Sequence, residues 1–535
     1  MNGGIGTQPV AEVFVILLLF VVVFALLARK LQTPYPIVLV IAGLVLSAIP
    51  GTPHIQLNPR LVFTVVLPPL LYAAAWTTSW REFRHNLVSV VSLAFGLVSF
   101  TIAGVALAIT WLFPGFDWRL GVILGAAVAP TDAVAAAAIA SQVGLPRRIV
   151  DLLEGESLVN DATGLLALEF GLALVFGGAA PTVGTGLLRL GYLIVAGLGT
   201  GALIALVVDR IERWIDDGPI EISISLMVPY AAYLGAQAID ASGVLAVVAC
   251  GLILSRRSAE FFSPSVRLQV YSVWTAAVFI LNGVVFVLVG LQLSGIVRGL
   301  EGVTTMRLVI DGALFSALVI ALRMAWVLPG ATVSFFIRRR LFRQSDQRPT
   351  GRELLVFAWS GMRGVVSLAA AMALPSVLPN GTPFPQRNLI VFLVFSVVVA
   401  TLVVQGLSLA PLIRALGLAG EKGAACEEQE AQRIAINAAL AHLEQARGHD
   451  RQEYGGVYDD LAQHYRERLN ALTGMPDAAR DETPHEYNKR RALLQELLGV
   501  QRRTILRLRR DGRIDDQVLR NLERDLDLQE AQGKP

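Results

Sequence analysis

The chain has 535 residues, of which 54% are hydrophobic and 16% charged, and its mean hydropathy is +0.59. A soluble domain carries about 25% charged residues, so this composition excludes a soluble enzyme, a secreted disulfide scaffold and a nucleic-acid binder. Residues 1–420 hold 26 basic and 20 acidic residues, whereas residues 421–535 hold 19 and 22. We therefore expect a polytopic membrane domain followed by a charged, soluble tail.

Apolar runs of about the length that crosses a bilayer, 17–25 residues, indicate thirteen spans. They lie at 11–28, 35–50, 61–78, 88–113, 119–141, 150–177, 186–208, 220–238, 241–255, 270–293, 305–337, 353–375 and 388–413. Three of these runs are unusually short or long, so twelve spans also fit the sequence. The first run has no basic residue before it, which predicts a retained span and not a signal peptide.

The basic residues of the loops indicate the orientation. One alternating set of loops contains about 17 Lys and Arg side chains and the other set about six, and the positive-inside rule places the richer set in the cytoplasm. We therefore predict a multi-pass protein of the plasma membrane, in a bacterium the inner membrane, with its N-terminus outside and its C-terminus in the cytoplasm. Thirteen spans satisfy this orientation.

The charged segment 419–535 predicts a helical cytoplasmic tail, for which a regulatory role is one hypothesis, attached to a membrane domain of residues 1–418. Leucines at helical spacing occur at 493–498, and Gly474-Met475-Pro476 predicts a break. The arginines between 502 and 510 fit a solvated helix face, or alternatively contact with anionic lipid.

Ionisable residues inside the membrane are costly, so each of them is a candidate functional residue. None of the six histidines lies in a predicted span, and no lysine occurs between Lys30 and Lys422. Proton or cation chemistry in the membrane must therefore use carboxylates, with arginine as the counter-ion.

Carboxylates cluster in the fifth and sixth spans. The cluster and its polar neighbours are Thr131, Asp132, Glu154, Glu156, Ser157, Asn160 and Asp161. Helical spacing puts Ser157 one turn from Asp161, and Glu156 one turn from Asn160. Acids at this density must be paired, protonated or neutralised by a bound cation. Carboxylates near the cytoplasmic end of a helix are the structural alternative, which fits Glu154 better than Asp161.

The twelfth span contains Ser360-Gly361-Met362-Arg363-Gly364, an arginine between glycines. If spans 1–6 and 8–13 are inverted repeats, spans 5 and 12 are equivalent, and both contain helix-breaking residues. A matched pair of interrupted helices indicates a midplane site in a secondary transporter. We expect Arg363 to neutralise the carbonyl ends of half-helices. Close helix packing is the alternative explanation for the glycines.

Arg323 is a second arginine within a long apolar run, in the eleventh span. Glu154 and Asp240 are its expected partners, because an unpaired charge in the membrane is unfavourable. We interpret this trio as structural ion pairing and not as an ion-binding site.

Together these motifs resemble the monovalent cation/proton antiporter-1 family, which includes bacterial sodium/proton antiporters of the NhaP type and animal sodium/proton exchangers. The resemblance covers about residues 10–415. It rests on Pro130-Thr131-Asp132, Glu156-Ser157-Leu158-Val159-Asn160-Asp161, Gly361-Met362-Arg363-Gly364 and Leu67-Pro68-Pro69-Leu70-Leu71.

The resemblance implies a homodimer in membrane lipid, with a dimerisation domain and a core domain that contains two crossed, interrupted helices. It implies that Na⁺ is held by Asp161, Glu156, Ser157 and the backbone carbonyl of Thr131, with Asp132 nearby or bound through water. The Asn160-Asp161 pair looks like that of electroneutral members. No resident cofactor and no nucleic-acid partner is expected. The family often has a glutamate after the Pro-Pro of span 3, where this chain has Tyr72-Ala73-Ala74-Ala75.

The predicted function is secondary antiport of Na⁺, Li⁺ or K⁺ against H⁺ in sodium and pH homeostasis, with both ligands competing for Asp161. Alternatives are a cation channel, in which the acids would line a pore, and a K⁺-selective K⁺/H⁺ antiporter. An intramembrane hydrolase that uses Ser157 or Asp161 is a further class, but no histidine or metal motif in the spans supports it.

Overall fold

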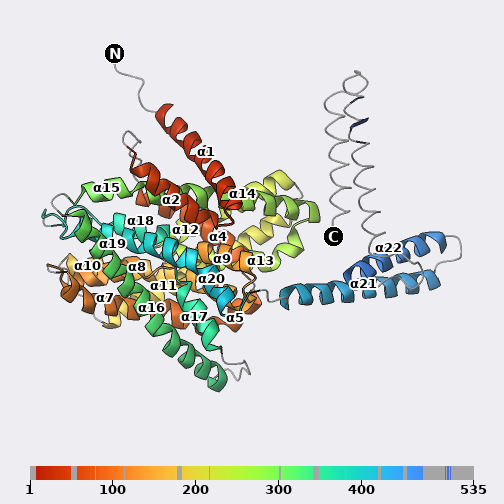
Figure 1. Ribbon diagram of the computed structural model, residues 1–535. Coiled ribbons are helices and arrows are strands. Elements are labelled where there is room, and N and C mark those ends of the chain that lie inside the picture. Colours follow the sequence, from red (N-terminus) through yellow and green to blue (C-terminus); the bar gives the residue numbers. More distant parts are fainter. Residues whose placement is uncertain are drawn as a thin grey trace, which may run out of the picture. The chain divides into compact units, whose positions relative to one another are not determined.

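The computed structural model describes residues 8–49, 57–78, 80–113, 115–176, 183–215, 217–300, 303–341, 349–379, 381–419, 423–449 and 455–473, and a few positions between 501 and 507. Within these ranges the chain is helical (Figure 1), and the extended pairing found there is one isolated bridge between Val377 and Pro383. The all-helical class expected from the sequence is therefore confirmed.

The chain divides into two compact units, residues 1–421 and residues 422–535. The first half of the larger unit contains α1 (Gln8–Lys30), α2 (Tyr35–Ser47), α3 (Pro59–Leu61), η1 (Val62–Val66), α4 (Leu67–Thr77), α5 (Trp80–His85), α6 (Leu87–Val91), η2 (Ser92–Leu97), α7 (Val98–Leu112), α8 (Trp118–Val128), α9 (Ala133–Val143) and α10 (Arg147–Val175). The roles that the sequence analysis gave to the two units stay predictions.

The second half of this unit is also helical. It contains α11 (Val183–Glu212), α12 (Gly218–Gln237), α13 (Gly243–Phe261), α14 (Pro264–Leu291), α15 (Leu293–Arg298), α16 (Thr305–Leu341), α17 (Gly351–Trp359), α18 (Val365–Met372), α19 (Arg387–Ala400), η3 (Thr401–Gln405) and α20 (Gly406–Ala415).

Among the described residues, eight helical segments are long and apolar enough to cross a membrane. They are Pro59–Thr77, Leu87–Leu112, Trp118–Ala140, Arg148–Val175, Gly184–Glu212, Val266–Arg298, Thr305–Arg340 and Arg387–Ala415. Each of the thirteen ranges expected to cross the membrane contains helix. The count of thirteen crossings and the inverted repeat stay predictions.

Two helical stretches, residues 118–143 and 351–372, are broken in the middle. The first break, Ala129–Asp132, separates α8 from α9, and the second, Ser360–Gly364, separates α17 from α18. Pro130 lacks the N–H that would continue the helix, and Asp132 starts α9 as its N-cap, with Oδ1 accepting from the Val134 N–H at 2.8 Å. Both halves of each broken helix thus end inside the apolar part of the protein.

Among the described residues, three helices contain a π-helical turn: η1, η2 or η3. η1 ends two residues before Pro68 and Pro69, which cannot donate hydrogen bonds to the preceding turn. The carbonyl of Val65 in this turn accepts from the hydroxyl of Tyr230 at 3.0 Å. In η2 the carbonyl of Ala94 accepts from Thr163 at 2.8 Å. Side chains from other helices therefore satisfy carbonyls in η1 and η2.

The buried apolar side chains form two clusters. One includes Val128, Phe286 and Leu368 from α8, α14 and α18, and the other includes Leu71 and Val247 from α4 and α13. α10 contributes to both clusters. Its polar residues therefore lie where the two apolar bodies meet.

The smaller unit is described as a pair of helices, α21 (Gly423–His449) and α22 (Gly455–Thr473), drawn in blue in Figure 1. The two helices pack on each other, and Arg466 lies 3.9 Å from Glu444 in an ion pair. The predicted break at 474–476 and the leucines at 493–498 lie outside the described residues.

Candidate functional site

The two helix breaks lie against each other and are joined by hydrogen bonds. The Asp132 N–H donates to the carbonyl of Met362 at 2.8 Å, and the Ser367 hydroxyl donates to the carbonyl of Pro130 at 3.2 Å. A Cβ added to Gly364 would lie 2.2 Å from Oδ2 of Asp132, closer than real atoms approach. The glycine at position 364 thus allows the two interrupted helices to come this close.

Arg363, in the second break, binds the C-terminal end of α8, which precedes the first break. Its side chain is buried, and Nε donates to the carbonyl of Val128, the last residue of α8, at 2.9 Å. Nη1 also donates to the carbonyl of Gly361, and the Arg363 N–H donates to Thr401 Oγ1 at 3.0 Å. The guanidinium thus lies against the carbonyl end of α8, which carries partial negative charge.

Thr131 connects the first break to α10. Its carbonyl accepts from the Ser157 hydroxyl at 2.8 Å, and its Oγ1 accepts from the Asn160 side-chain amide at 2.6 Å. The same threonine hydroxyl donates to Oε1 of Glu156 at 3.2 Å. One residue of the break is therefore held by three side chains of a single helix, which fixes the break against α10.

Arg323 and Glu156 form a bidentate ion pair. Nη1 donates to Oε1 at 2.5 Å and Nη2 to Oε2 at 2.9 Å, and both side chains are 1% exposed. Nε of Arg323 also donates to the carbonyl of Ala358 in α17 at 3.1 Å. The pair is thus buried and multiply hydrogen-bonded, as a charge pair in an apolar interior must be.

This pairing corrects the partners that we expected for Arg323. Glu154 instead lines a cavity beside α10, and Asp240 lies exposed in the turn after α12 with a φ of 52°. Glu154 and Glu156 are two positions apart and therefore point away from each other on a helix of 3.6 residues per turn. The sequence did not show which of these directions faces α16.

A cavity of about 80 Å³ adjoins the first break. Its polar lining includes Thr131, Asp132, Glu154, Ser157 and Asp161. Asp161 is 5% exposed, and its Oδ1 has no hydrogen-bond partner in the part of the chain that the structure describes. A buried carboxylate oxygen without a donor is unfavourable unless it binds a proton or a cation.

Asn282 in α14 is a lining residue that our sequence analysis missed. It is 3% exposed and lines the cavity together with residues of α10. The sequence feature that could have identified it is a single amide side chain within an apolar run. Ala74, in the stretch where the family often has a glutamate, also lines the cavity, so the wall formed by α4 is apolar at this position.

Two interrupted helices whose breaks are in contact, beside a buried carboxylate with one oxygen unpartnered among the described residues, define the class of protein, a polytopic secondary transporter. Residues 15–415 match the family model described as sodium/hydrogen exchanger, transmembrane. The chain belongs to this family of membrane-embedded, multi-pass transporters.

Several relatives match most or nearly all of the chain. An uncharacterised Na⁺/H⁺ exchanger of Mycobacterium tuberculosis (strain ATCC 25618 / H37Rv) is 35% identical over 97% of this chain and 95% of its own length. The Na⁺/H⁺ antiporter ApNhaP of Aphanothece halophytica is 32% identical over 77% of this chain and 75% of its own. A sodium, potassium, lithium and rubidium/H⁺ antiporter of Bacillus pumilus (strain SAFR-032) is 31% identical over 83% of this chain and 66% of its own.

The fold resembles that of a solved structure. The sodium proton antiporter MjNhaP1 from Methanocaldococcus jannaschii, at pH 8, superposes with a TM-score of 0.59 at 19% sequence identity. The match covers 76% of this chain and 99% of that protein. At this identity the likeness supports the fold and not the residues of the site.

Proposed function

We propose that the protein is a secondary antiporter that exchanges Na⁺ for H⁺, with Asp161 as the shared binding group. The observation that carries this proposal is the buried Asp161 carboxylate, whose Oδ1 lacks a partner among the described residues and which lines the cavity beside the helix breaks. Membership of the sodium/hydrogen exchanger family supports the same activity.

The proposed ligands of the cation are oxygens only. Asp161 and Ser157 lie one helical turn apart on α10, and Asp132 and the Thr131 carbonyl reach the same cavity from the break. Carboxylate, hydroxyl and carbonyl oxygens suit a hard cation such as Na⁺ or Li⁺. A water molecule occupies about 30 Å³, so the cavity has room for a cation with one or two waters.

Glu156 receives a different role from the one implied by the family resemblance. Both of its oxygens already accept hydrogen bonds from Arg323. We therefore assign Glu156 to the ion pair that anchors α10 to α16 and α17, and not to the direct ligands of the cation. Asn160 likewise acts on the site by holding Thr131 through its amide.

The mechanism that follows is competition. A protonated Asp161 is neutral and has no charge for Na⁺, whereas ionised Asp161 attracts the cation. One site that is filled by either ligand, and that faces the two membrane sides in turn, couples the two flows. Because the residue beside Asp161 is the neutral Asn160, we propose one proton per cation and hence electroneutral exchange.

The proposal also includes the membrane, the orientation and the oligomeric state of the protein. We place the protein in the plasma membrane, or in a bacterium the inner membrane, as a homodimer with the N-terminus outside and the C-terminus in the cytoplasm. We assign it no resident cofactor and no enzymatic activity. K⁺/H⁺ exchange at the same oxygens is a second candidate, favoured by the Bacillus pumilus relative that is named for four alkali cations.

The test is dequenching of a pH-sensitive dye in everted membrane vesicles, titrated with Na⁺, Li⁺ and K⁺. Lowering the pH should raise the apparent KM for Na⁺ and leave the maximal rate nearly unchanged, because high Na⁺ displaces the proton. Proton inhibition that saturating Na⁺ does not overcome would place proton binding elsewhere. Single-channel currents in a planar bilayer would instead indicate a pore.

A further inference from the structure

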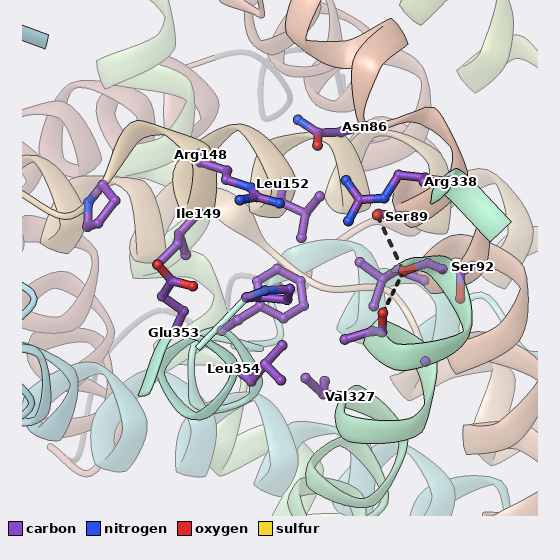
Figure 2. Close-up of a pocket in the computed structure, with 17 residues that line it drawn as sticks. Asn86, Ser89, Ser92, Arg148, Ile149, Leu152, Val327, Arg338, Glu353 and Leu354 are labelled. Atoms are coloured by element: carbon purple, nitrogen blue, oxygen red, sulfur yellow. Dashed lines mark hydrogen bonds between the residues drawn. The ribbon is translucent and has the colours of Figure 1, made fainter. Parts of the chain in front are cut away.

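A second, larger cavity lies in the membrane unit, between α6, α10, α16 and α17 (Figure 2). Its volume is about 280 Å³, and none of its lining residues lines the Asp161 cavity. The lining brings together residues from three chain segments that the positive-inside rule assigns to the cytoplasm: Asn86, Arg148 and Arg338. In the proposed orientation this cavity therefore lies at the cytoplasmic side of the membrane domain.

The polar side of the cavity is cationic. Figure 2 shows the side chains of Arg148 and Arg338 extending from different helices toward the same region of the cavity. Arg338 is 4% exposed, whereas Arg148 is exposed at the beginning of α10. Two guanidinium groups that approach each other repel, and an anion between them would turn this repulsion into attraction.

Neutral donors surround the two arginines. The hydroxyls of Ser89, Ser92 and Ser334 and the amide of Asn86 line the cavity, and Ser89 donates to Ser334 at 3.5 Å. This set of hydroxyl, amide and guanidinium groups resembles the donor sets that bind phosphate oxygens.

The helices add to the positive potential. The chain at Pro146, which lines the cavity, leads into the 29-residue helix α10, and this helix start has no side-chain cap hydrogen bond. The partial positive charge of a helix N-terminus favours an anion there. One carboxylate also lines the cavity, that of Glu353, but its Oε2 accepts from the Thr350 N–H at 2.7 Å as part of a capping box. The carboxylate keeps its charge, so Arg148 and Arg338 leave the lining with one net positive charge.

The rest of the lining is apolar, which indicates a ligand with an organic part. It consists mainly of Leu93, Ile149, Leu152, Val327, Leu354 and Phe357. We propose that this cavity binds a phosphate-bearing anion at the cytoplasmic side, with its phosphate between Arg148 and Arg338 and its less polar part against these side chains. The source is either a lipid head group or a soluble phosphate compound.

Phe357 connects the cavity to the Arg323–Glu156 ion pair. Phe357 lines the cavity, its ring lies 5.3 Å from the Arg323 guanidinium, and its carbonyl accepts from Arg323 Nη2 at 3.4 Å. Arg323 in turn holds Glu156, one position before Ser157. A bound anion that moves Phe357 therefore shifts α10 at the transport site, and this regulatory step rests on the proposed antiport function.

Binding is tested on the purified full-length protein in neutral detergent, by thermal unfolding with added inorganic phosphate or short-chain phosphatidylglycerol. Short-chain phosphatidylcholine, which has no net charge, is the lipid control. A ligand of the folded state raises Tm with concentration. We expect Arg148→Gln and Arg338→Gln each to weaken the apparent affinity at least about tenfold, since each removes a charged hydrogen-bonding partner.

The matched control is Arg339→Gln, the same change at the next, exposed position of α16, and it should bind like wild type. A response to inorganic phosphate identifies a soluble ligand, and a response to phosphatidylglycerol alone identifies a lipid. No rise in Tm with either probe, or an equal rise in all variants, overturns the proposal. If Arg338→Gln does not fold, the Tm response of Arg148→Gln, a change at an exposed position, still tests the proposal.

Coupling is tested in proteoliposomes by measuring the apparent KM for Na⁺ with and without the ligand identified above. We expect a change of at least about twofold in wild type and Arg339→Gln, and none in Arg148→Gln. An unchanged KM in wild type overturns the regulatory step. Asp161→Asn separates the two proposals, because it should lose exchange while its Tm still responds to the anion.

Discussion

Two acids of α10, five positions apart, have opposite surroundings. Glu156 is 1% exposed and accepts from Arg323 through both oxygens and from Thr131. Asp161 is 5% exposed, lines a cavity, and has an oxygen without a hydrogen-bond partner among the described residues. The helix places the first acid toward α16 and the second toward the space between the two apolar clusters.

The difference assigns the two acids of one helix to different proposed roles, Glu156 to the fold and Asp161 to transport. A carboxylate that accepts from a buried arginine through both oxygens already has its counter-ion, and it holds α10 in place. A carboxylate left open in the same apolar interior needs a proton or a cation in every state of the cycle. The comparison predicts that changes at Asp161 affect exchange, whereas changes at the Arg323–Glu156 pair affect folding.

The largest effect is expected from Asp161→Asn, which keeps the size of the side chain but removes its charge and its titration. Dye dequenching by Na⁺, Li⁺ and K⁺ should disappear while expression and Tm stay close to those of wild type. Asp161→Glu should keep part of the activity with a shifted pH profile. Glu169→Gln, at an exposed acid of the same helix, is the control. Substantial exchange by Asp161→Asn would move the shared site away from α10.

The next effect concerns stability. Arg323→Ala leaves Glu156 buried without its counter-ion, and breaking a buried pair in this way costs about 3–5 kcal/mol. We expect a large fall in Tm and in folded protein, at least as marked as any loss of cation affinity. Arg339→Gln serves as the control on the same helix. Normal thermal stability together with a selective loss of Na⁺ affinity would contradict the structural role of Arg323.

Replacing both partners should cost less than removing one. In Arg323→Met/Glu156→Leu no charge is left buried, and such replacements are often neutral, or stabilising by about 1–4 kcal/mol. Its Tm should therefore lie above that of Arg323→Ala. A double variant that is less stable than the single one would show that Glu156 stabilises the fold through contacts other than the ion pair.

A smaller effect is expected from Ser157→Ala. The hydroxyl donates to the Thr131 carbonyl at 2.8 Å and lines the cavity. A hydrogen bond of this kind contributes about 1 kcal/mol, so the apparent KM for Na⁺ should rise about fivefold while the pH dependence is kept. Measured Na⁺ titrations identical to wild type would remove Ser157 from the ligands.

The smallest expected effect is a null result. If the Asn160–Asp161 pair carries one proton per cation, no net charge moves in a cycle. Na⁺-driven proton flux in proteoliposomes should then be the same with and without a potassium–valinomycin potential. Acceleration by an inside-negative or inside-positive potential would show that a second carboxylate, such as Asp132, also titrates during transport.

Particular residues show which features of the structure the sequence predicted and which it did not. Pro130 and the glycines around Arg363 predicted the two interruptions, and the structure has breaks at both places. The partners of Arg323 were wrongly expected to be Glu154 and Asp240, and Asn282 was missed altogether. Each miss concerns which residues of distant helices face each other, and periodicity within one helix does not contain this information.

By itself the sequence determined the all-helical membrane class, the charged composition of residues 421–535, and the acids and breaks of the proposed transport site. These follow from composition, the length of apolar runs and local backbone chemistry, which act over a few residues. The tertiary structure alone decided that Glu156 is paired and Asp161 is open. The reason is that Arg323, 167 positions away from Glu156, meets α10 only after the helices have packed, and the rotation of α10 then sets the surroundings of each acid.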